Sequence, residues 1–122
     1  MKKKILIVDD EPGIVRILSM RLKARGFEVY EALDGFQGVK IAEKEVPDLI
    51  LMDIKMPHGS GIRVFERLKQ IDSTKEIPVI FMTAFPTKEI TAQVLKMGAK
   101  ECISKPFISK DFEKTIALAI QN

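Results

Sequence analysis

One run of the sequence, LILMD at residues 49–53, constrains the fold more than any other. Four consecutive apolar residues are typical of a strand that is buried on both faces, as at the centre of a parallel sheet. The run ends in a carboxylate, Asp53, and not in turn residues. A buried acid is costly unless a neighbouring group compensates it, so we expect polar or charged partners beside Asp53.

The rest of the chain alternates between strand-like and helix-like patterns five times. Strands are predicted at about residues 5–8, 29–32, 49–53, 78–83 and 101–104; the first, third and fourth of these runs are largely apolar, and the second and fifth are of mixed character. Helices are predicted from Pro12 to about residue 25, from 35 to 46, from 61 to 71, from 87 to 97, and from near Ser109 to the end. Five such units with short loops predict one α/β domain over residues 1–122, a doubly wound five-stranded parallel sheet with helices on both faces.

Composition excludes several other classes of protein. No apolar run approaches the ~20 residues of a membrane span, and the N-terminus does not resemble a signal peptide, so we expect a cytoplasmic protein without membrane contact. The single cysteine, Cys102, cannot form an internal disulfide. The net charge of +3 comes from basic residues spread along the chain, which does not predict nucleic-acid binding.

Polar side chains stand at the end of four of the predicted strands. Because the carboxyl ends of parallel strands share one edge of a sheet, these side chains are expected to meet at one rim. They are Asp9, Asp10, Asp53, Thr83 and Lys105. Crowded carboxylates repel one another, and an all-oxygen set of ligands suits Mg²⁺ or Mn²⁺.

The chemical groups of these residues are suited to one kind of reaction. A carboxylate can attack phosphorus and form an acyl phosphate if cations neutralise the negative charges of the carboxylate and of the incoming phosphoryl group. Lys105 supplies a positive charge, and the hydroxyl of Thr83 can donate a hydrogen bond to a phosphoryl oxygen. The sequence therefore predicts phosphoryl transfer to Asp53.

Four short runs carry a resemblance to a known family. They are ILIVDDE at 5–11, MDIKMP at 52–57, MTA at 82–84 and SKPF at 104–107. In this order, and over essentially the whole chain, they resemble the CheY-like receiver domain of two-component response regulators. The resemblance implies a flavodoxin-like fold with strand order 2-1-3-4-5.

The resemblance also implies a role for each matching residue. Asp53 is the phosphoacceptor, which takes a phosphoryl group from a phosphohistidine of a sensor kinase or phosphotransfer protein. Thr83 and Lys105 hold the phosphoryl oxygens, and the Lys105–Pro106 bond is cis. The metal ligands are Asp9 through water, Asp10, Asp53 and the backbone carbonyl of Lys55. No enzymatic turnover is implied beyond the protein's own phosphorylation and dephosphorylation.

One position departs from the family's pattern. Three residues before the lysine the family usually carries Tyr or Phe as a rotamer switch, and here the residue is Cys102. A thiol is too small for that role. The alternative is thus a receiver-like module that binds partners without phosphorylation. A third reading, a phosphatase or nucleotide-binding enzyme, is disfavoured because no Gly-rich loop follows the first strand.

The partners implied by the resemblance are proteins. A histidine kinase or histidine phosphotransfer protein is expected to dock on the first helix, with Pro12, Ile14 and Val15 offering an apolar contact. The phosphorylation signal is expected to pass to a downstream protein target or to an output domain that this sequence does not contain. A stand-alone regulator and a receiver cut from a longer chain both fit the sequence.

Overall fold

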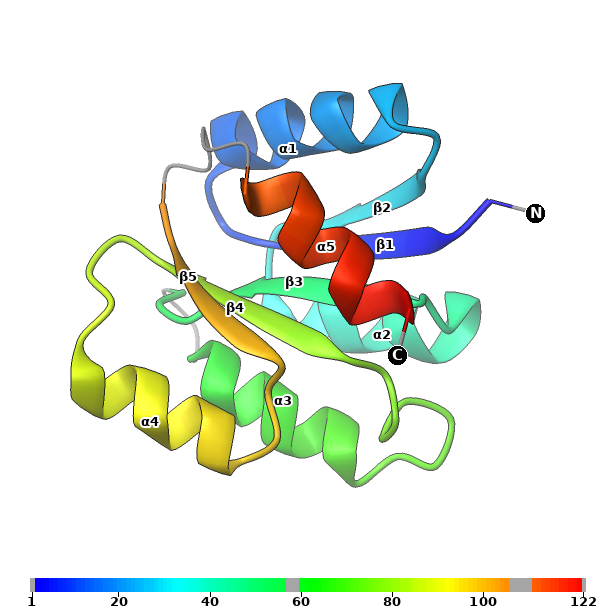
Figure 1. Ribbon diagram of the computed structural model, residues 1–122. Helices are drawn as coiled ribbons and strands as arrows, with labels where there is room; N and C mark the ends of the chain where they lie inside the picture. Colours follow the sequence, from blue (N-terminus) through cyan, green and yellow to red (C-terminus); the bar gives the residue numbers. More distant parts are fainter. Residues whose placement is uncertain (1, 57–59, 106–110, 122) are drawn as a thin grey trace.

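A parallel sheet forms the middle layer of the protein, whose computed structural model describes residues 2–56, 60–105 and 111–121. Within these ranges the strands are β1 (Lys4–Val8), β2 (Glu28–Ala32), β3 (Leu49–Asp53), β4 (Val79–Thr83) and β5 (Glu101–Ser104). The helices are α1 (Pro12–Ala24), α2 (Gly35–Glu45), α3 (Gly61–Lys69), α4 (Lys88–Lys96) and α5 (Asp111–Gln121). The strands pair in parallel in the order β2-β1-β3-β4-β5 (Figure 1), which confirms the predicted doubly wound, flavodoxin-like fold.

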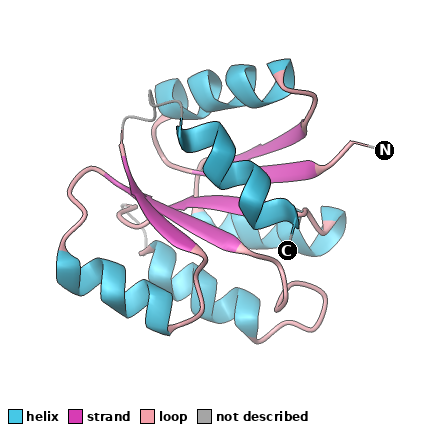
Figure 2. Cartoon of the chain, in the orientation of Figure 1, coloured by secondary structure: helices cyan, strands magenta, loops and turns pink. Residues whose placement is uncertain are grey.

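Helices cover both faces of the sheet (Figure 1, Figure 2). α1 and α5 lie on one face, and α2, α3 and α4 lie on the other. Among the described residues the buried apolar side chains accordingly form two clusters. The α1–α5 cluster includes Ile5, Ile7, Val15, Leu18, Leu49, Leu51, Ile80, Met82 and Ile116. The α2–α3–α4 cluster includes Leu6, Val8, Ala42, Ile50, Met52, Phe65, Val79, Phe81 and Val94.

The central strand β3 is buried along its whole length, as its apolar run predicts. It pairs with β1 on one side and with β4 on the other. Successive side chains of a strand point to opposite faces, so Asp53 points to the same face as Leu49 and Leu51, which belong to the α1–α5 cluster. The sequence of β3 thus brings a carboxylate to the carboxyl edge of the sheet, on the side of α1 and α5.

Local signals explain where the helices begin and end. The hydroxyl of Ser60 accepts a hydrogen bond from Arg63 N–H at 3.3 Å, and that of Thr87 accepts one from Ile90 N–H at 3.1 Å, so these two residues cap the N-termini of α3 and α4. α2 ends at Glu45 because the next residue, Val46, has a left-handed backbone with φ of 44°. Pro47 follows directly and disfavours a helical conformation at the residue before it.

Some predicted features lie outside the described residues. They include the cis bond between Lys105 and Pro106 and the start of the last helix near Ser109; α5 is described from Asp111 onward. In the part of the chain that is described, none of the helices combines the length and the apolar character needed to cross a bilayer.

Gly61, the first residue of α3, packs against the end of β3 too closely for a side chain. A Cβ there would lie 2.1 Å from the backbone oxygen of Asp53, and Gly61 N–H donates to the carbonyl of Ile54 at 2.7 Å. We expect Gly61→Ala to lower the free energy of unfolding by about 1 to 3 kcal/mol, because the added methyl group forces the backbone apart.

Gly13 in α1 provides the matched control, because a Cβ at that position would meet nothing within 4 Å. Gly13→Ala is expected to stabilise the protein by about 0.5 to 1 kcal/mol, since alanine favours the helix. Urea denaturation measures both variants. A Gly61→Ala protein as stable as the wild type would contradict the close packing.

Candidate functional site

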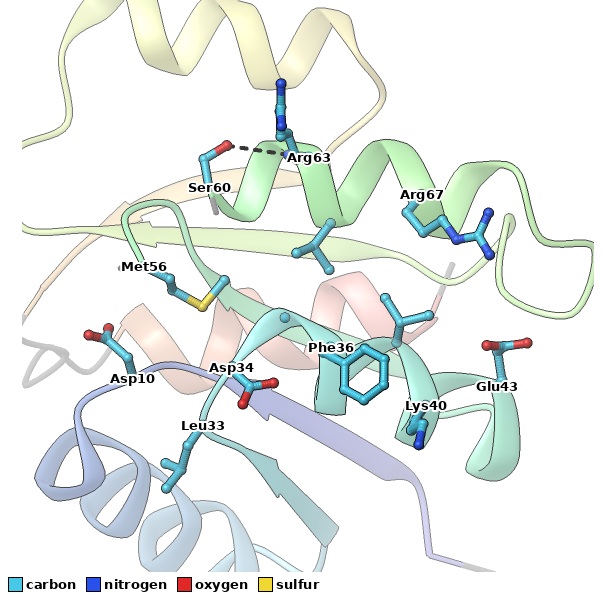
Figure 3. Close-up of a pocket in the computed structure, with 13 residues that line it drawn as sticks. Asp10, Leu33, Asp34, Phe36, Lys40, Glu43, Met56, Ser60, Arg63 and Arg67 are labelled. Atoms are coloured by element: carbon cyan, nitrogen blue, oxygen red, sulfur yellow. Dashed lines mark hydrogen bonds between the residues drawn. The ribbon is translucent and has the colours of Figure 1, made fainter. Parts of the chain in front are cut away.

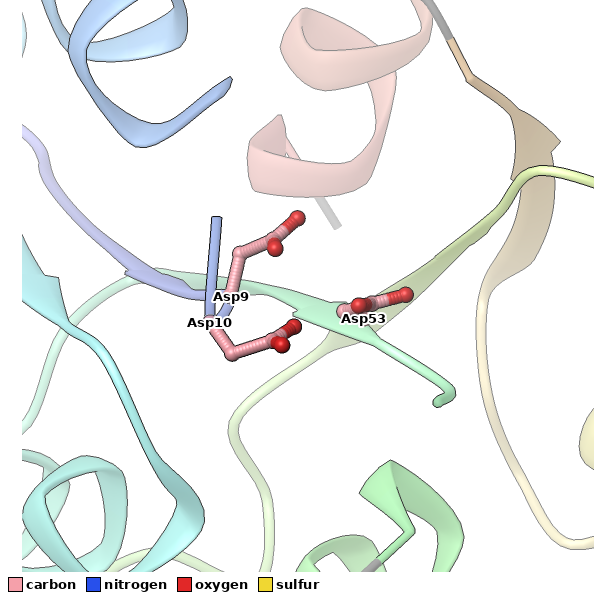
Figure 4. A group of neighbouring side chains, drawn as sticks. All are labelled: Asp9, Asp10 and Asp53. Carbon is pink, nitrogen blue, oxygen red and sulfur yellow. The ribbon is translucent and has the colours of Figure 1, made fainter. Parts of the chain in front are cut away.

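Three carboxylates meet at the carboxyl edge of the sheet, as the sequence predicts. Asp9 and Asp10 directly follow β1, and Asp53 is the last residue of β3. Each offers a carboxylate oxygen that lies within 4.8 Å of the other two (Figure 4). Asp9 is fully buried and Asp53 is 4% exposed. We refer to these three residues as the acidic cluster.

Lys105 brings a positive charge into this cluster. Its backbone N–H donates to the carbonyl of Thr83 at 2.8 Å, which anchors the residue beside the end of β4. Its ammonium Nζ lies 2.7 Å from Asp9 Oδ2 and 3.3 Å from Asp53 Oδ2. The side chain is only 8% exposed, so these ion pairs are largely shielded from solvent. The predicted convergence of Lys105 on Asp53 is confirmed.

The same ammonium has a partner to which sequence reasoning gave no role. Glu11 Oε1 lies 3.1 Å from Lys105 Nζ, although the two residues are 94 positions apart in the chain. Glu11 occupies the N-cap position of α1, but its side chain makes no capping hydrogen bond to the described residues of that helix. The only sequence signal was its position directly after Asp10, at the rim where the strands end.

Burial and charge change the ionisation of the site. The pKa of Asp53 rises from 3.8 to about 6, chiefly because burial disfavours its charged form, and also because Asp9 repels it. Lys105 and a hydrogen bond from the backbone N–H of Lys55 act in the opposite direction. Burial acts to lower the pKa of Lys105, but its bonds to Asp9 and Glu11 outweigh burial and raise that pKa overall.

The donor set fits a hard divalent cation. Its ligand atoms are carboxylate oxygens, which Mg²⁺ and Mn²⁺ prefer. Burial is the main reason that the pKa of Asp53 is raised, and repulsion by Asp9 adds to it even though Lys105 acts to lower that pKa. A bound cation would relieve that repulsion.

Thr83 completes the rim. It ends β4, and the residue before it, Met82, is paired with Asp53 in the sheet. Its side chain is 6% exposed, and its hydroxyl oxygen accepts a hydrogen bond from the backbone N–H of Phe85 at 3.3 Å. The hydroxyl is thus held at the edge of the sheet, on the strand next to Asp53.

Cys102 lies on β5, where it is paired with Phe81. It is half-buried and packs against the α2–α3–α4 cluster. Burial raises the pKa of its thiol, while a hydrogen bond with the side chain of Thr91 opposes that rise. A raised pKa keeps a thiol protonated near neutral pH, which favours a packing role for Cys102 over a reactive one.

A groove of about 780 Å³ lies between α2 and α3, beside the acidic cluster (Figure 3). The apolar side chains that line it are Leu33, Phe36, Val39, Met56 and Val64. Of the described residues of the site, it is lined by Asp10 and not by Asp9, Asp53 or Lys105. The groove therefore adjoins the rim without containing the buried carboxylate and ammonium, and the candidate chemistry belongs to the rim.

Comparisons with known proteins point to one family. The family model of the response regulator receiver domain matches residues 5–117. The sporulation initiation phosphotransferase F of Bacillus subtilis is 39% identical over 107 residues, which cover 88% of this chain and 85% of that protein. The DNA-binding dual master transcriptional regulator RpaA of Synechocystis is 36% identical over 114 residues, 93% of this chain. The chain spans only 46% of RpaA, about half of its length.

The fold is similar to that of solved structures. The chemotaxis protein CheY4 of Vibrio cholerae superposes with a TM-score of 0.92 at 28% sequence identity, and the match covers 98% of this chain and 99% of that protein. The non-phosphorylated receiver domain of HemR from Leptospira biflexa superposes with a TM-score of 0.89 at 27% identity, and the match covers 99% of this chain and 96% of that domain.

Proposed function

This chain belongs to the response regulator receiver domain family, and on that premise we propose that Asp53 is the residue that accepts the phosphoryl group. Receiver domains are the phosphorylation-switched signalling modules of two-component systems. The observation that carries the assignment is the contact of Lys105 Nζ with both Asp53 and the fully buried Asp9. We further propose that residues 1–122 form one receiver domain.

In the proposed reaction a carboxylate oxygen of Asp53 forms a bond to phosphorus. The bond between phosphorus and the imidazole nitrogen of a phosphohistidine breaks, and the leaving imidazole keeps the electron pair and takes up a proton. Lys105 neutralises charge on the phosphoryl oxygens, and the hydroxyl of Thr83 donates a hydrogen bond to one of them. The closeness of Lys105 to Asp53 before the reaction supports this role.

We propose Mg²⁺, or Mn²⁺ in its place, as the cofactor. Its ligands would be Asp10, Asp53 and the backbone carbonyl of Lys55, with Asp9 acting through water. When bound, the ion supplies a positive charge that offsets the negative charge of the incoming group. The gathering of the three carboxylates within 4.8 Å supports this assignment.

The proposed partners are a histidine kinase or histidine phosphotransfer protein, and a downstream protein target or output domain. The expected apolar contact on α1 needs one correction, because Val15 is 2% exposed and packs into the α1–α5 cluster. The helical period places Ile17 and Met20 on the outer face instead, where they are 59% and 66% exposed. These two side chains are the better candidates for a contact with a partner.

Intact mass spectrometry tests the proposed function. After incubation with Mg²⁺ and phosphoramidate we expect the wild type to gain one phosphoryl group, and Asp53→Ala to gain none. Asp72→Ala is the matched control, because the side chain of Asp72 is 99% exposed, and it should react like the wild type. A chelator added beforehand should prevent the gain. No gain in any of these proteins would favour the phosphorylation-independent alternative.

A further inference from the structure

The Lys105 ammonium lies within ion-pair distance of three carboxylates in the described part of the chain. Its Nζ lies 2.7 Å from Asp9, 3.1 Å from Glu11 and 3.3 Å from Asp53, and among these contacts the one with Glu11 Oε1 has the geometry of a hydrogen bond. A phosphoryl oxygen that binds Lys105 would therefore compete with the Glu11 carboxylate for an N–H donor of this ammonium.

The three partners differ in how easily they can move away. Asp9 is fully buried, and its Oδ1 also accepts the backbone N–H of Glu11 at 2.9 Å. Asp53 is 4% exposed and is itself the proposed acceptor. The side chain of Glu11 is 59% exposed, so water can solvate its carboxylate at little energetic cost once it leaves Lys105. Glu11 is therefore the partner that can be displaced.

The backbone of Glu11 is fixed independently of its side chain. Its N–H donates to Asp9, and its carbonyl accepts the N–H of Val15 at 3.1 Å in the first turn of α1. The side chain takes no part in capping the described helix. Changes to the Glu11 side chain should therefore alter its contact with Lys105 and leave the helix and the acidic cluster in place.

We propose that Glu11 is a positioning residue that holds the Lys105 ammonium at the mouth of the site until a phosphoryl oxygen replaces the Glu11 carboxylate. Glu11 thereby competes with the phosphoryl group for Lys105 and slows phosphorylation of Asp53. This inference rests on the proposed function. A contact with an exposed carboxylate is weak, so we expect its removal to accelerate phosphorylation by about two- to five-fold.

Two substitutions distinguish the effect of the contact between Glu11 and Lys105 from the effect of the negative charge of Glu11. Glu11→Ala removes both the carboxylate and its contact with Lys105. Glu11→Asp keeps the charge, but the shorter side chain does not reach Lys105 and instead caps α1, since aspartate is a favoured N-cap residue. Glu66→Ala, an exposed acid on α3, is the matched control. The rate of phosphoryl gain from phosphoramidate with Mg²⁺ is measured by intact mass.

We expect both Glu11 variants to react faster than the wild type and the Glu66 variant to react at the wild-type rate. Wild-type rates in both Glu11 variants would overturn the inference. A faster Glu11→Ala beside an unchanged Glu11→Asp would also overturn it, because charge at the mouth, and not the contact, would then set the rate. A wild type that gains no phosphoryl group would instead defeat the proposed function itself.

A second measurement needs neither metal nor phosphodonor. Heteronuclear NMR of the metal-free protein follows the exchange of the Lys105 ammonium protons with water. We expect exchange to be faster in Glu11→Ala and Glu11→Asp than in the wild type, because the ammonium loses the hydrogen bond that it donates to Glu11. Unchanged exchange in both variants would show that Glu11 does not hold Lys105 in solution.

Discussion

Replacing Lys105 with methionine is expected to lower the free energy of unfolding by about 3 to 5 kcal/mol in metal-free buffer near neutral pH. The substitution keeps a long side chain but removes the charge that pairs with Asp9 and Asp53. Asp9 is fully buried, so its carboxylate would be left without the cation that compensates it. Breaking a buried ion pair on one side only is costly for this reason.

Added Mg²⁺ should recover part of the stability lost in Lys105→Met, since a cation at the acidic cluster would take over the compensating charge. Urea denaturation with and without Mg²⁺ measures both effects. Lys3→Met, which removes an exposed lysine outside the sheet, is the control and should change stability by less than about 0.5 kcal/mol. A loss of under about 1 kcal/mol in Lys105→Met would contradict the role given to this ion pair.

Asp53→Asn is expected to have the opposite effect on the metal-free protein and to raise the free energy of unfolding by about 1 to 3 kcal/mol near neutral pH. The folded-state pKa of Asp53, about 6, lies above its ordinary value of 3.8, so the folded protein binds this proton more tightly than the unfolded chain does. The stability that this provides is fully present below about pH 4 and is lost as the pH rises through about 6.

The amide that replaces the Asp53 carboxylate in this variant carries no charge, so the variant does not lose stability as the pH rises through about 6. The gap between the two proteins should therefore be widest above about pH 6 and should narrow toward about pH 4. Mg²⁺ should stabilise the wild type more than the variant. Asp72→Asn, at a site 99% exposed, is the control. Thermal or urea unfolding across this pH range measures the difference, and a variant no more stable than the wild type near neutral pH would contradict the electrostatic account.

Much of the fold and of the site could be predicted because the signals are local. The run at residues 49–53 identifies a buried strand from its composition alone, and its terminal carboxylate then has to lie at the carboxyl edge of the sheet. Asp9, Asp10 and Lys105 follow from the same rule, because each stands directly after a predicted strand. The parallel topology of the sheet was therefore sufficient to predict that these side chains converge.

The remaining features depend on three-dimensional detail that a pattern of residue types does not contain. The contact between Glu11 and Lys105 depends on the rotamer of one exposed side chain among many acidic residues. The burial of Val15 and the exposure of Ile17 depend on how α1 is rotated against the sheet. The left-handed conformation of Val46 is unexpected for a β-branched residue, and the following proline gave only an approximate helix end.

The division of the interior into two clusters has a consequence for how such a protein can diversify. The α1–α5 cluster and the α2–α3–α4 cluster are separated by the backbone of the sheet, so residues of one cluster can be exchanged without repacking the other. Asp53 and Lys105 stand at the carboxyl edge of the sheet. One face of the molecule can thus acquire new recognition properties over generations while the chemistry at the edge is inherited unchanged.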